Sequence, residues 1–329
     1  MTEVPKQIVV TVDTEEEGLW GGNYPVRNCS TKNLRGLQRF QATCDELEAP
    51  PTYLIDAAVL TDEQAASDLK RWQNAKLCEV GAHCHPWCNP PIVSETCSSV
   101  ESYLCNHPAE VQRDKLAWLT QRIADSLEQA PTAYRAGRYG FSSTSAEILE
   151  DLGYAVDSSV IPLHDYRQDG GPDFFEQPRL PFRYFDCGRN LVELPVTTGF
   201  TRRGLGLRAK LWRQLRSKPW TYIRAAGIAD RLGIARRVKL SPEGTQLHDL
   251  ISLVDACHAD GLSTLVLMLH SSSLIPGVSP YAKDSAALDN LYSRLVEIVR
   301  YAKIQYQYQP ALLTAAARAI APNLTQAHT

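Results

Sequence analysis

The hydrophobic residues of this chain fall into short, nearly continuous runs, and the stretches between the runs have apolar residues at helical spacing. The first run, over 7–12, is rich in β-branched residues and apolar nearly throughout, which is typical of a strand buried on both faces. Runs of the same kind predict further strands over 52–56, 77–80, 133–136, 154–157, 191–196 and 262–269.

The segments between these runs are predicted to be helices. In 110–129, four aliphatic side chains share one helical face: Leu116, Leu119, Ile123 and Leu127. The other predicted helices cover 33–48, 62–74, 143–152, 245–259, 285–303 and 311–320. Strands and helices therefore alternate, which indicates βα units, a parallel sheet and the α/β class. Because α/β barrels reach this length as one domain, we expect a single domain over 1–329.

Two segments interrupt the alternation. The first, 158–190, is polar and contains Pro and Gly, and we expect an inserted loop that forms a lid or a groove wall. The second, 201–240, holds twelve Lys or Arg and one acidic residue, so it carries +11 while the rest of the chain carries −14. Leucine and tryptophan residues among the cations predict a basic helical insertion. It is either a solvated cap or a surface for anionic lipid headgroups or for phosphate or carboxylate groups of a substrate.

The composition is that of a soluble globular enzyme, with 44% hydrophobic and 22% charged residues. A net charge of −3 indicates no general affinity for nucleic acid. We find no apolar run of ~20 residues that would span a membrane and no signal-peptide pattern at the N-terminus. Nine cysteines without framework spacing then predict reduced thiols and a cytoplasmic location. The spacing of Cys78, Cys84 and Cys88 does not match the usual pairs of a structural zinc site.

Residues suited to catalysis follow the predicted strands. His83 and His85 lie two positions apart after the third strand, so both imidazoles face one side of an extended backbone. Asp13 and Glu15 follow the first strand with the same spacing, and His270 follows the last long strand. Two imidazoles and a carboxylate suit a divalent metal, and a second carboxylate suits a general base. Taken one at a time, these groups also fit a solvated acidic loop and structural histidines.

In a parallel barrel the carboxyl ends of the strands meet on one face. The order of the residues at these ends resembles the polysaccharide deacetylase (NodB-homology) family over 8–320. The family's first motif, Thr-Phe-Asp-Asp, aligns with Thr11–Thr14, where Thr14 replaces a metal-binding Asp and Glu15 matches an Asp-x-Asp variant. The last motif, Leu-x-x-His, is intact at Leu267–His270.

The two middle motifs depart from the family pattern. In the histidine motif, His-Ser/Thr-x-x-His, His83 matches but Trp87 stands four residues later. His85 then supplies the second imidazole, as in the His-x-His-Pro-Trp subgroup of similar proteins. The resemblance implies a distorted (β/α)7 barrel of the polysaccharide deacetylase type, with the basic helical insertion added to it.

The arginine motif, Arg-x-Pro-Tyr, aligns on Arg135, with Gly137 in place of Pro. Either Arg138 or Tyr139 takes the Tyr position. Asp157 follows the next strand and matches part of a further motif, in which we expect it to hold Arg135 or the catalytic histidine.

The resemblance also implies the roles of the site residues. One divalent metal, zinc first and otherwise cobalt, nickel, manganese or iron, is expected on Glu15, His83 and His85, with Glu16 as the alternative carboxylate ligand. Asp13 is the expected base, Arg135 holds it ionised, and His270 is the expected acid. The residues expected to contact the substrate are Trp87, Arg138, Tyr139 and Leu267.

The function predicted from this resemblance is removal of an N-acetyl group from a sugar by a metal-dependent hydrolase. A cytoplasmic location favours a nucleotide-linked or lipid-linked sugar, and 201–240 is the expected contact with an anionic membrane at its inner face. Two alternatives remain open. One is an amide or cyclic imide hydrolase with a substrate that is not a sugar. The other is an inactive barrel that binds a glycan or a membrane, which the Thr14 replacement favours.

Overall fold

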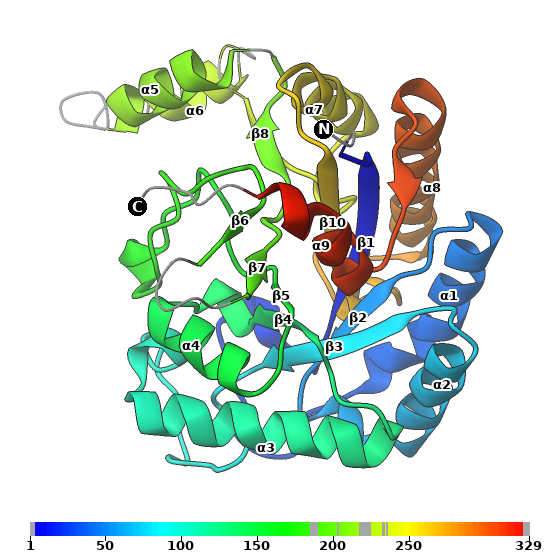
Figure 1. The fold of residues 1–329 in the computed structure, drawn as a ribbon, viewed down its shortest axis with the longest axis vertical. Coiled ribbons are helices and arrows are strands. Elements are labelled where there is room, and N and C mark those ends of the chain that lie inside the picture. Colours follow the sequence, from blue (N-terminus) through cyan, green and yellow to red (C-terminus); the bar gives the residue numbers. More distant parts are fainter. Residues whose placement is uncertain are drawn as a thin grey trace.

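Parallel strands form a curled sheet at the centre of the protein (Figure 1). The computed structural model describes residues 4–184, 190–202, 204–216, 225–231, 234 and 236–324. Seven strands are neighbours in the order β10-β1-β2-β3-β4-β5-β7 and pair in parallel. Their bounds are β1 Gln7–Thr14, β2 Thr52–Ile55, β3 Glu79–Cys84, β4 Ala133–Ala136, β5 Val156–Asp157, β7 Val192–Glu193 and β10 Thr264–His270. Two short strands extend the sheet, β6 (Phe182–Arg183) antiparallel on β7 and β11 (Gln309–Pro310) on β1.

Irregular backbone closes the gap between β7 and β10. The Thr197 N–H donates to the carbonyl oxygen of Val266 on β10, at 3.1 Å. The Met268 N–H donates to the carbonyl oxygen of Leu240, also at 3.1 Å. Because hydrogen bonds of single residues replace a regular strand at this point, the barrel is distorted. The predicted α/β class and distorted barrel are confirmed.

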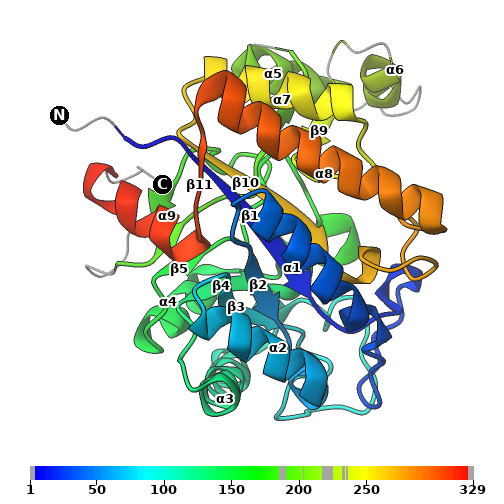
Figure 2. The same ribbon diagram turned by 90° about the vertical axis from the view of Figure 1, so that its right-hand side faces the viewer.

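Helices cover the outside of the barrel, as Figures 1 and 2 show together. They are α1 Leu37–Glu46, α2 Glu63–Asn74, α3 Ala109–Leu127, α4 Ser143–Asp151, α7 Leu247–Ala259 and α8 Ser285–Tyr306. The predicted helix over 33–48 begins as a 3-10 turn, Lys32–Gly36, before α1. No described helix is long and apolar enough to cross a membrane.

One end of the barrel is filled by apolar side chains and covered by the last helix, α9 (Leu313–Ile320), which lies at the amino-terminal ends of the strands (Figure 2). The buried cluster there consists of Val9, Leu54, Ala133, Val156, Val192, Leu194, Val266, Leu313, Ala316, Ala317 and Ile320. Because alternate residues of a strand share a face, Val9 at this end places Thr11 and Asp13 progressively closer to the other end. The polar side chains of β1 therefore gather at its carboxyl end.

Close packing of three strands depends on Gly81 in β3. A Cβ at this position would lie 2.5 Å from the carbonyl oxygen of Ala133 in β4 and 2.7 Å from Cδ2 of Leu54 in β2. The absence of a side chain therefore lets β3 lie close to both neighbours. β3 continues beyond the predicted run to Cys84, so His83 lies within the strand and His85 follows it.

The described part of the basic insertion is mostly helical. The strand β8 (Thr198–Phe200) precedes it, β9 (Arg237–Lys239) lies at its end, and the two strands pair antiparallel. Between them α5 (Leu205–Arg216) and α6 (Ala225–Arg231) extend away from the barrel (Figure 1). Trp212 is buried there in a small apolar cluster with Phe200. Several basic and aromatic residues of this segment lie outside the described residues: Arg203, Lys218, Trp220 and Arg224.

Between β5 and β7, the segment predicted as an inserted loop contains a 3-10 turn, Arg167–Asp169, and the short strand β6. Its residues 185–189, with Cys187, are not described. The other eight cysteines are free. Cys78 and Cys84 are buried in the main apolar core.

Candidate functional site

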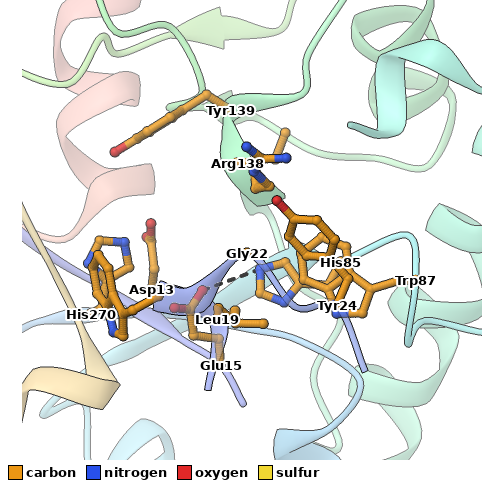
Figure 3. A pocket seen from close by; sticks show the side chains of 12 residues that line it. Asp13, Glu15, Leu19, Gly22, Tyr24, His85, Trp87, Arg138, Tyr139 and His270 are labelled. Carbon is orange, nitrogen blue, oxygen red and sulfur yellow. Dashed lines mark ion pairs between the residues drawn. The ribbon is translucent and has the colours of Figure 1, made fainter. Parts of the chain in front are cut away.

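The candidate residues from β1, β3, β4 and β10 meet at the carboxyl ends of these strands. The strand register places Asp13 beside His270 and His83 beside Arg135. A cavity of about 330 Å³ opens there (Figure 3). Its lining residues are Asp13, Glu15, Leu19, Trp20, Gly22, Tyr24, His85, Trp87, Ala136, Arg138, Tyr139 and His270.

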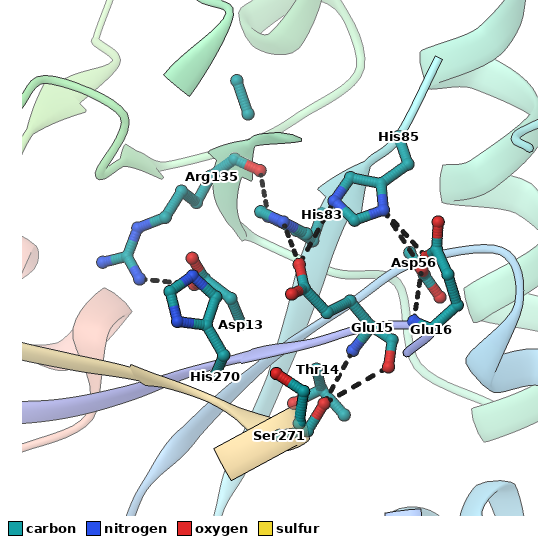
Figure 4. A network of polar contacts seen from close by, with 12 residues as sticks. Asp13, Thr14, Glu15, Glu16, Asp56, His83, His85, Arg135, His270 and Ser271 are labelled. Carbon is teal, nitrogen blue, oxygen red and sulfur yellow. Dashed lines mark hydrogen bonds and ion pairs between the residues drawn. The ribbon is translucent and has the colours of Figure 1, made fainter. Parts of the chain in front are cut away.

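Glu15, His83 and His85 form a cluster that suits a metal ion. Glu15 Oε2 lies 3.4 Å from His83 Nε2 and 3.3 Å from His85 Nε2, and all three residues are buried (Figure 4). The Nδ1–H of His83 donates to the Arg135 carbonyl oxygen at 2.9 Å, which leaves the Nε2 lone pair facing Glu15. Two imidazole nitrogens and one carboxylate oxygen are a donor set that zinc and related divalent metals accept.

A second carboxylate, Glu16, lies on the opposite side of His85. Glu16 Oε2 is 2.9 Å from His85 Nδ1, and Glu16 Oε1 accepts the Trp87 Nε1–H at 2.7 Å. Hydrogen bonds of this kind orient the ring of a metal-binding histidine. Burial and the charge of Glu16 raise the pKa of the neighbouring Asp56 carboxyl to about 7. The geometry therefore favours Glu15 as the ligand and Glu16 as the residue that orients His85.

The backbone at Glu15 is fixed by residues from two other segments. Its N–H donates to Ser271 Oγ at 3.0 Å, and its carbonyl oxygen accepts the Asn33 side-chain N–H at 2.8 Å. Thr14, which stands in the metal position of the family motif, instead donates its hydroxyl to the Val12 carbonyl oxygen at 3.0 Å. The hydroxyl of Thr14 is therefore engaged with its own strand, and the carboxylate next along the chain reaches the histidines.

Asp13 forms a buried ion pair with Arg135. Arg135 Nη1 lies 2.6 Å from Asp13 Oδ1 and also donates to Thr11 Oγ1 at 2.9 Å. Burial raises the pKa of Asp13, but the positive charges of Arg135, His83 and His270 outweigh this effect and lower the pKa to about 2. Asp13 is therefore ionised at neutral pH, as a proton acceptor must be.

Ser158, rather than Asp157, holds the other side of Arg135. The Nε–H of Arg135 donates to the Ser158 carbonyl oxygen at 2.8 Å, and Nη2 donates to Ser158 Oγ at 3.0 Å. Asp157 accepts the Ser159 hydroxyl at 2.6 Å. The expectation that Asp157 holds Arg135 or His270 was wrong, because its neighbour on the other face of the strand makes the contact.

His270 is paired with a carboxylate that no sequence pattern identified, Glu243. Its Nδ1 lies 2.8 Å from Glu243 Oε2, and its backbone N–H donates to Glu243 Oε1 at 3.1 Å. Burial lowers the pKa of His270, but the charge of Glu243 overcomes this effect and raises the pKa to about 9. Glu243 belongs to the turn Ser241–Gly244 after the basic insertion, which has no strand or helix pattern to mark it. The pair keeps His270 protonated at neutral pH.

Comparison with known proteins finds relatives in structure alone. No family model matches the chain, and no curated protein sequence matches it. A structure assigned as a polysaccharide deacetylase from Mycobacterium smegmatis is 14% identical, with a TM-score of 0.57, and the match covers 100% of this chain and 95% of that one. This chain has the polysaccharide deacetylase fold. The resemblance expected from the motifs is confirmed at the level of the fold, whereas the His-x-His-Pro-Trp subgroup stays a prediction.

Two further similar structures are more distant. The Xyl-CE4 domain of a multidomain xylanase from the hindgut metagenome of Trinervitermes trinervoides is 10% identical, with a TM-score of 0.45, over 95% of this chain and 90% of that one. The peptidoglycan deacetylase PdaC from Bacillus subtilis is 10% identical, with a TM-score of 0.41, over 97% of this chain and 93% of that one. Scores at this level carry no further argument.

The two positions that depart from the family's middle motifs, His85 and Gly137, are in contact with each other. A Cβ at Gly137 would lie 2.4 Å from Cδ2 of His85 and 2.6 Å from the Cys84 carbonyl oxygen. Proline at this position is therefore excluded by the ring of His85, the second imidazole of the shortened His-x-His spacing. Trp87 stacks on the ring of His85, with the two ring centres 4.2 Å apart.

Leu267 does not lie in the site. It is fully buried in the main core and does not line the cavity, so the expectation that it contacts the substrate was wrong. The reason is the alternation of β10, where Met268 and His270 share a face that Leu267 does not. The other residues expected to contact the substrate, Trp87, Arg138 and Tyr139, all line the cavity.

Proposed function

We propose that this protein is a metal-dependent hydrolase that removes an N-acetyl group from a sugar. One observation carries this proposal. The cluster of Glu15, His83 and His85, which suits a metal ion, lies in the same site as one group that can accept a proton and one that can donate a proton. Asp13 is held ionised by Arg135, and His270 is held protonated by Glu243. A general base and a general acid at one site are what amide hydrolysis needs.

The proposed mechanism assigns one task to each group. Glu15, His83 and His85 would hold a divalent metal, which would polarise the acyl carbonyl and lower the pKa of the attacking water. Asp13 takes the proton of the attacking water, and Arg135 keeps this carboxylate ionised and oriented. His270 gives its proton to the leaving amine, while a backbone N–H near Tyr139 stabilises the charge on the acyl oxygen.

We propose a nucleotide-linked or lipid-linked N-acetylated sugar in the cytoplasm as the substrate. The cavity supports a sugar because Trp20, Tyr24 and Trp87 line it, and aromatic rings pack against the apolar faces of such rings. The test is a screen of the metal-loaded protein against N-acetylated sugars, nucleotide-linked N-acetylated sugars and cyclic imides, with acetate release and ring opening as readouts. Acetate release that stops with a chelator and returns with added metal supports the proposal.

Other results of this screen identify the alternatives. Ring opening of cyclic imides without acetate release would replace the sugar deacetylase by an amide or cyclic imide hydrolase. Metal retention with no turnover of any substrate, together with glycan or vesicle binding, would indicate an inactive binding barrel.

The pair of Glu243 and His270 predicts the alkaline side of the pH profile. With the pKa of His270 raised to about 9, the acid stays protonated at neutral pH, and kcat/KM should fall as the pH rises through about 9. Glu243→Gln removes the charge that raises this pKa, so the alkaline limb should move down by ~1–3 pH units. Steady-state rates between pH 5 and pH 10 measure the limb in both proteins.

A matched control for this experiment is Glu176→Gln, which removes a carboxylate that pairs with Arg213 outside the cavity. Its alkaline limb should coincide with that of the unmodified protein. An unchanged limb in Glu243→Gln would contradict the role of Glu243 in setting the charge of His270.

The basic insertion is the proposed contact with an anionic membrane. Leu207 on α5 and Ile228 on α6 are 78% and 52% exposed, and Lys210 on α5 is exposed as well. Part of the positive charge is neutralised within the chain, since Arg213 pairs with Glu176 and Arg236 with Asp249 at 2.6 Å. The remaining mixture of apolar and basic side chains is typical of a helix that rests in a headgroup layer.

Vesicle binding tests this contact. The protein should co-sediment with anionic vesicles and not with neutral ones, and the binding should be lost at ~0.5 M salt because screening weakens the attraction. Leu207→Asp should weaken it, whereas Ile304→Asp, at a site 81% exposed on α8, should not. Equal sedimentation with both kinds of vesicle, or with neither, would contradict the contact.

A further inference from the structure

Arg138 is a half-buried cation on the cavity wall whose hydrogen bonds go to uncharged groups. Its Nη1 donates to the Ser99 carbonyl oxygen at 3.2 Å and makes a short contact with Ser102 Oγ. Its guanidinium carbon lies 4.3 Å from the centre of the Tyr103 ring and 5.1 Å from that of Tyr24. The serine and tyrosine side chains hold the guanidinium in place without neutralising it.

No carboxylate in the described part of the chain forms an ion pair with Arg138. The two acidic side chains that line the same cavity have other partners: Asp13 pairs with Arg135, and Glu15 contacts His83 and His85. A positive charge that is half removed from water and lacks a carboxylate partner is costly, and such a charge is compensated when an anion binds.

The guanidinium also has donors to offer. Its hydrogen bonds to the described residues all come from Nη1, and Nη2 and Nε make none. The edge formed by these two nitrogens has the fork geometry that binds a carboxylate or a phosphate through two parallel hydrogen bonds.

The backbone presents this side chain to the cavity through an unusual turn. Arg138 and Tyr139 have φ of 52° and 59°, in the left-handed region that residues with side chains seldom adopt. The turn follows Gly137, where the ring of His85 leaves no room for a Cβ. Figure 3 shows Arg138 on the same side of the cavity as Tyr139, facing the region where Asp13, Glu15 and His85 converge.

We propose that Arg138 binds an anionic group of the substrate, a phosphoryl or carboxylate group, so that the substrate is an N-acetylated sugar that carries this group close to the scissile amide. The inference rests on the proposed function for the identity of the sugar. The rings of Tyr24 and Tyr103 flank the cation, and Arg138 lines the cavity. Arg138 is thus the residue that separates charged from neutral substrates.

The test compares the binding of charged and neutral probes by calorimetry, which does not require turnover. The probes are N-acetylglucosamine 1-phosphate, N-acetylmuramic acid and N-acetylglucosamine, with inorganic phosphate as a competitor. The unmodified protein should bind at least one charged probe more tightly than the neutral one. Arg138→Gln should weaken that binding by ~10–100-fold, the range of a charge-assisted hydrogen bond, and leave the neutral probe within about threefold.

Two further variants separate charge from shape. Arg138→Lys keeps the charge without the fork, so it should restore part of the phosphate affinity and less of the carboxylate affinity. Arg300→Gln removes an exposed arginine on α8 and should leave every affinity unchanged. The ratio between the two charged probes identifies the phosphoryl or the carboxylate group as the partner.

The outcomes distinguish this inference from the proposed function. Equal loss of charged and neutral probes in Arg138→Gln, no loss of either, or no binding of a charged probe to the unmodified protein would each overturn the anion site. If the charged probe binds through Arg138 but no N-acetylated sugar releases acetate, the anion site stands and the deacetylase function fails. If acetate is released and Arg138→Gln keeps the same ratio of rates on charged and neutral sugars as the unmodified protein, the function stands and the anion site fails.

Discussion

Replacing Asp13 with asparagine is expected to lower kcat by ~10²–10⁴, the range for a lost general base. The amide keeps the size of the side chain but cannot take a proton from water. Steady-state hydrolysis with the metal-loaded variant measures the loss, and metal analysis verifies that the cluster is still filled. His270→Ala should lower kcat by a similar factor with the metal retained. Near-normal turnover in both variants would place the chemistry elsewhere.

The same change in Asp13 should also destabilise the fold, because Arg135 is completely buried and would keep its charge without an anion. Removing one partner of a buried pair costs about 3–5 kcal/mol. The pKa of Asp13 is lowered to about 2 in the folded protein, so the carboxylate contributes stability above its unfolded pKa and loses it as the pH falls through about 2. The stability difference between variant and unmodified protein should therefore be full at pH 7 and shrink below pH 4, as measured by denaturant unfolding.

The second large effect concerns the metal. The purified protein should carry about one divalent ion, zinc first and otherwise cobalt, nickel, manganese or iron, and His83→Ala should lose it. Glu15→Gln should lose the ion as well, because this carboxylate lies within 3.4 Å of both histidines. Glu16→Gln should keep it with ~10–100-fold weaker affinity, since Glu16 only orients His85. Elemental analysis and competition with a chelator measure content and affinity.

A third glutamate in the same run provides the control for these variants. Glu17 accepts the Ser30 hydroxyl and is not part of the cluster, so Glu17→Gln should keep normal affinity. Loss of metal in Glu16→Gln with retention in Glu15→Gln would move the ion to the other group of metal-type residues on the far side of His85. That group consists of Glu16, Asp56, His85 and Cys88.

Much of the fold could be predicted because its strands are buried on both faces and therefore stand out as apolar runs. The run over 7–12 became β1, and the run over 262–269 became β10. Prediction was poorest between β5 and β10. There the expected strand over 191–196 is a two-residue pairing, and single hydrogen bonds of Thr197 and Leu240 complete the barrel. The barrel is closed there by hydrogen bonds between backbone groups, which every residue type can form, so no pattern of side chains predicts them.

The sequence by itself determined which side chains reach the carboxyl end of the barrel. The two-residue period of extended backbone places Asp13 and Glu15 on one side of the chain where β1 ends, and His83 and His85 on one side where β3 ends, whatever surrounds them. The order of the strands then determines that Arg135 and His270 follow at the same end. The shared face of residues two apart follows from the backbone geometry of one strand and needs no contact with the rest of the chain.

Only the tertiary structure decided how these side chains are paired. The sequence could not separate Glu15 from Glu16, because their difference is the ring nitrogen of His85 that each one faces. It could not select Glu243, which reaches His270 from a turn 27 residues away, or Ser158 in place of Asp157. The physical reason is that a hydrogen bond depends on the distance and relative direction of two groups in space. For groups far apart in the sequence, the fold sets both quantities, and the local sequence pattern sets neither.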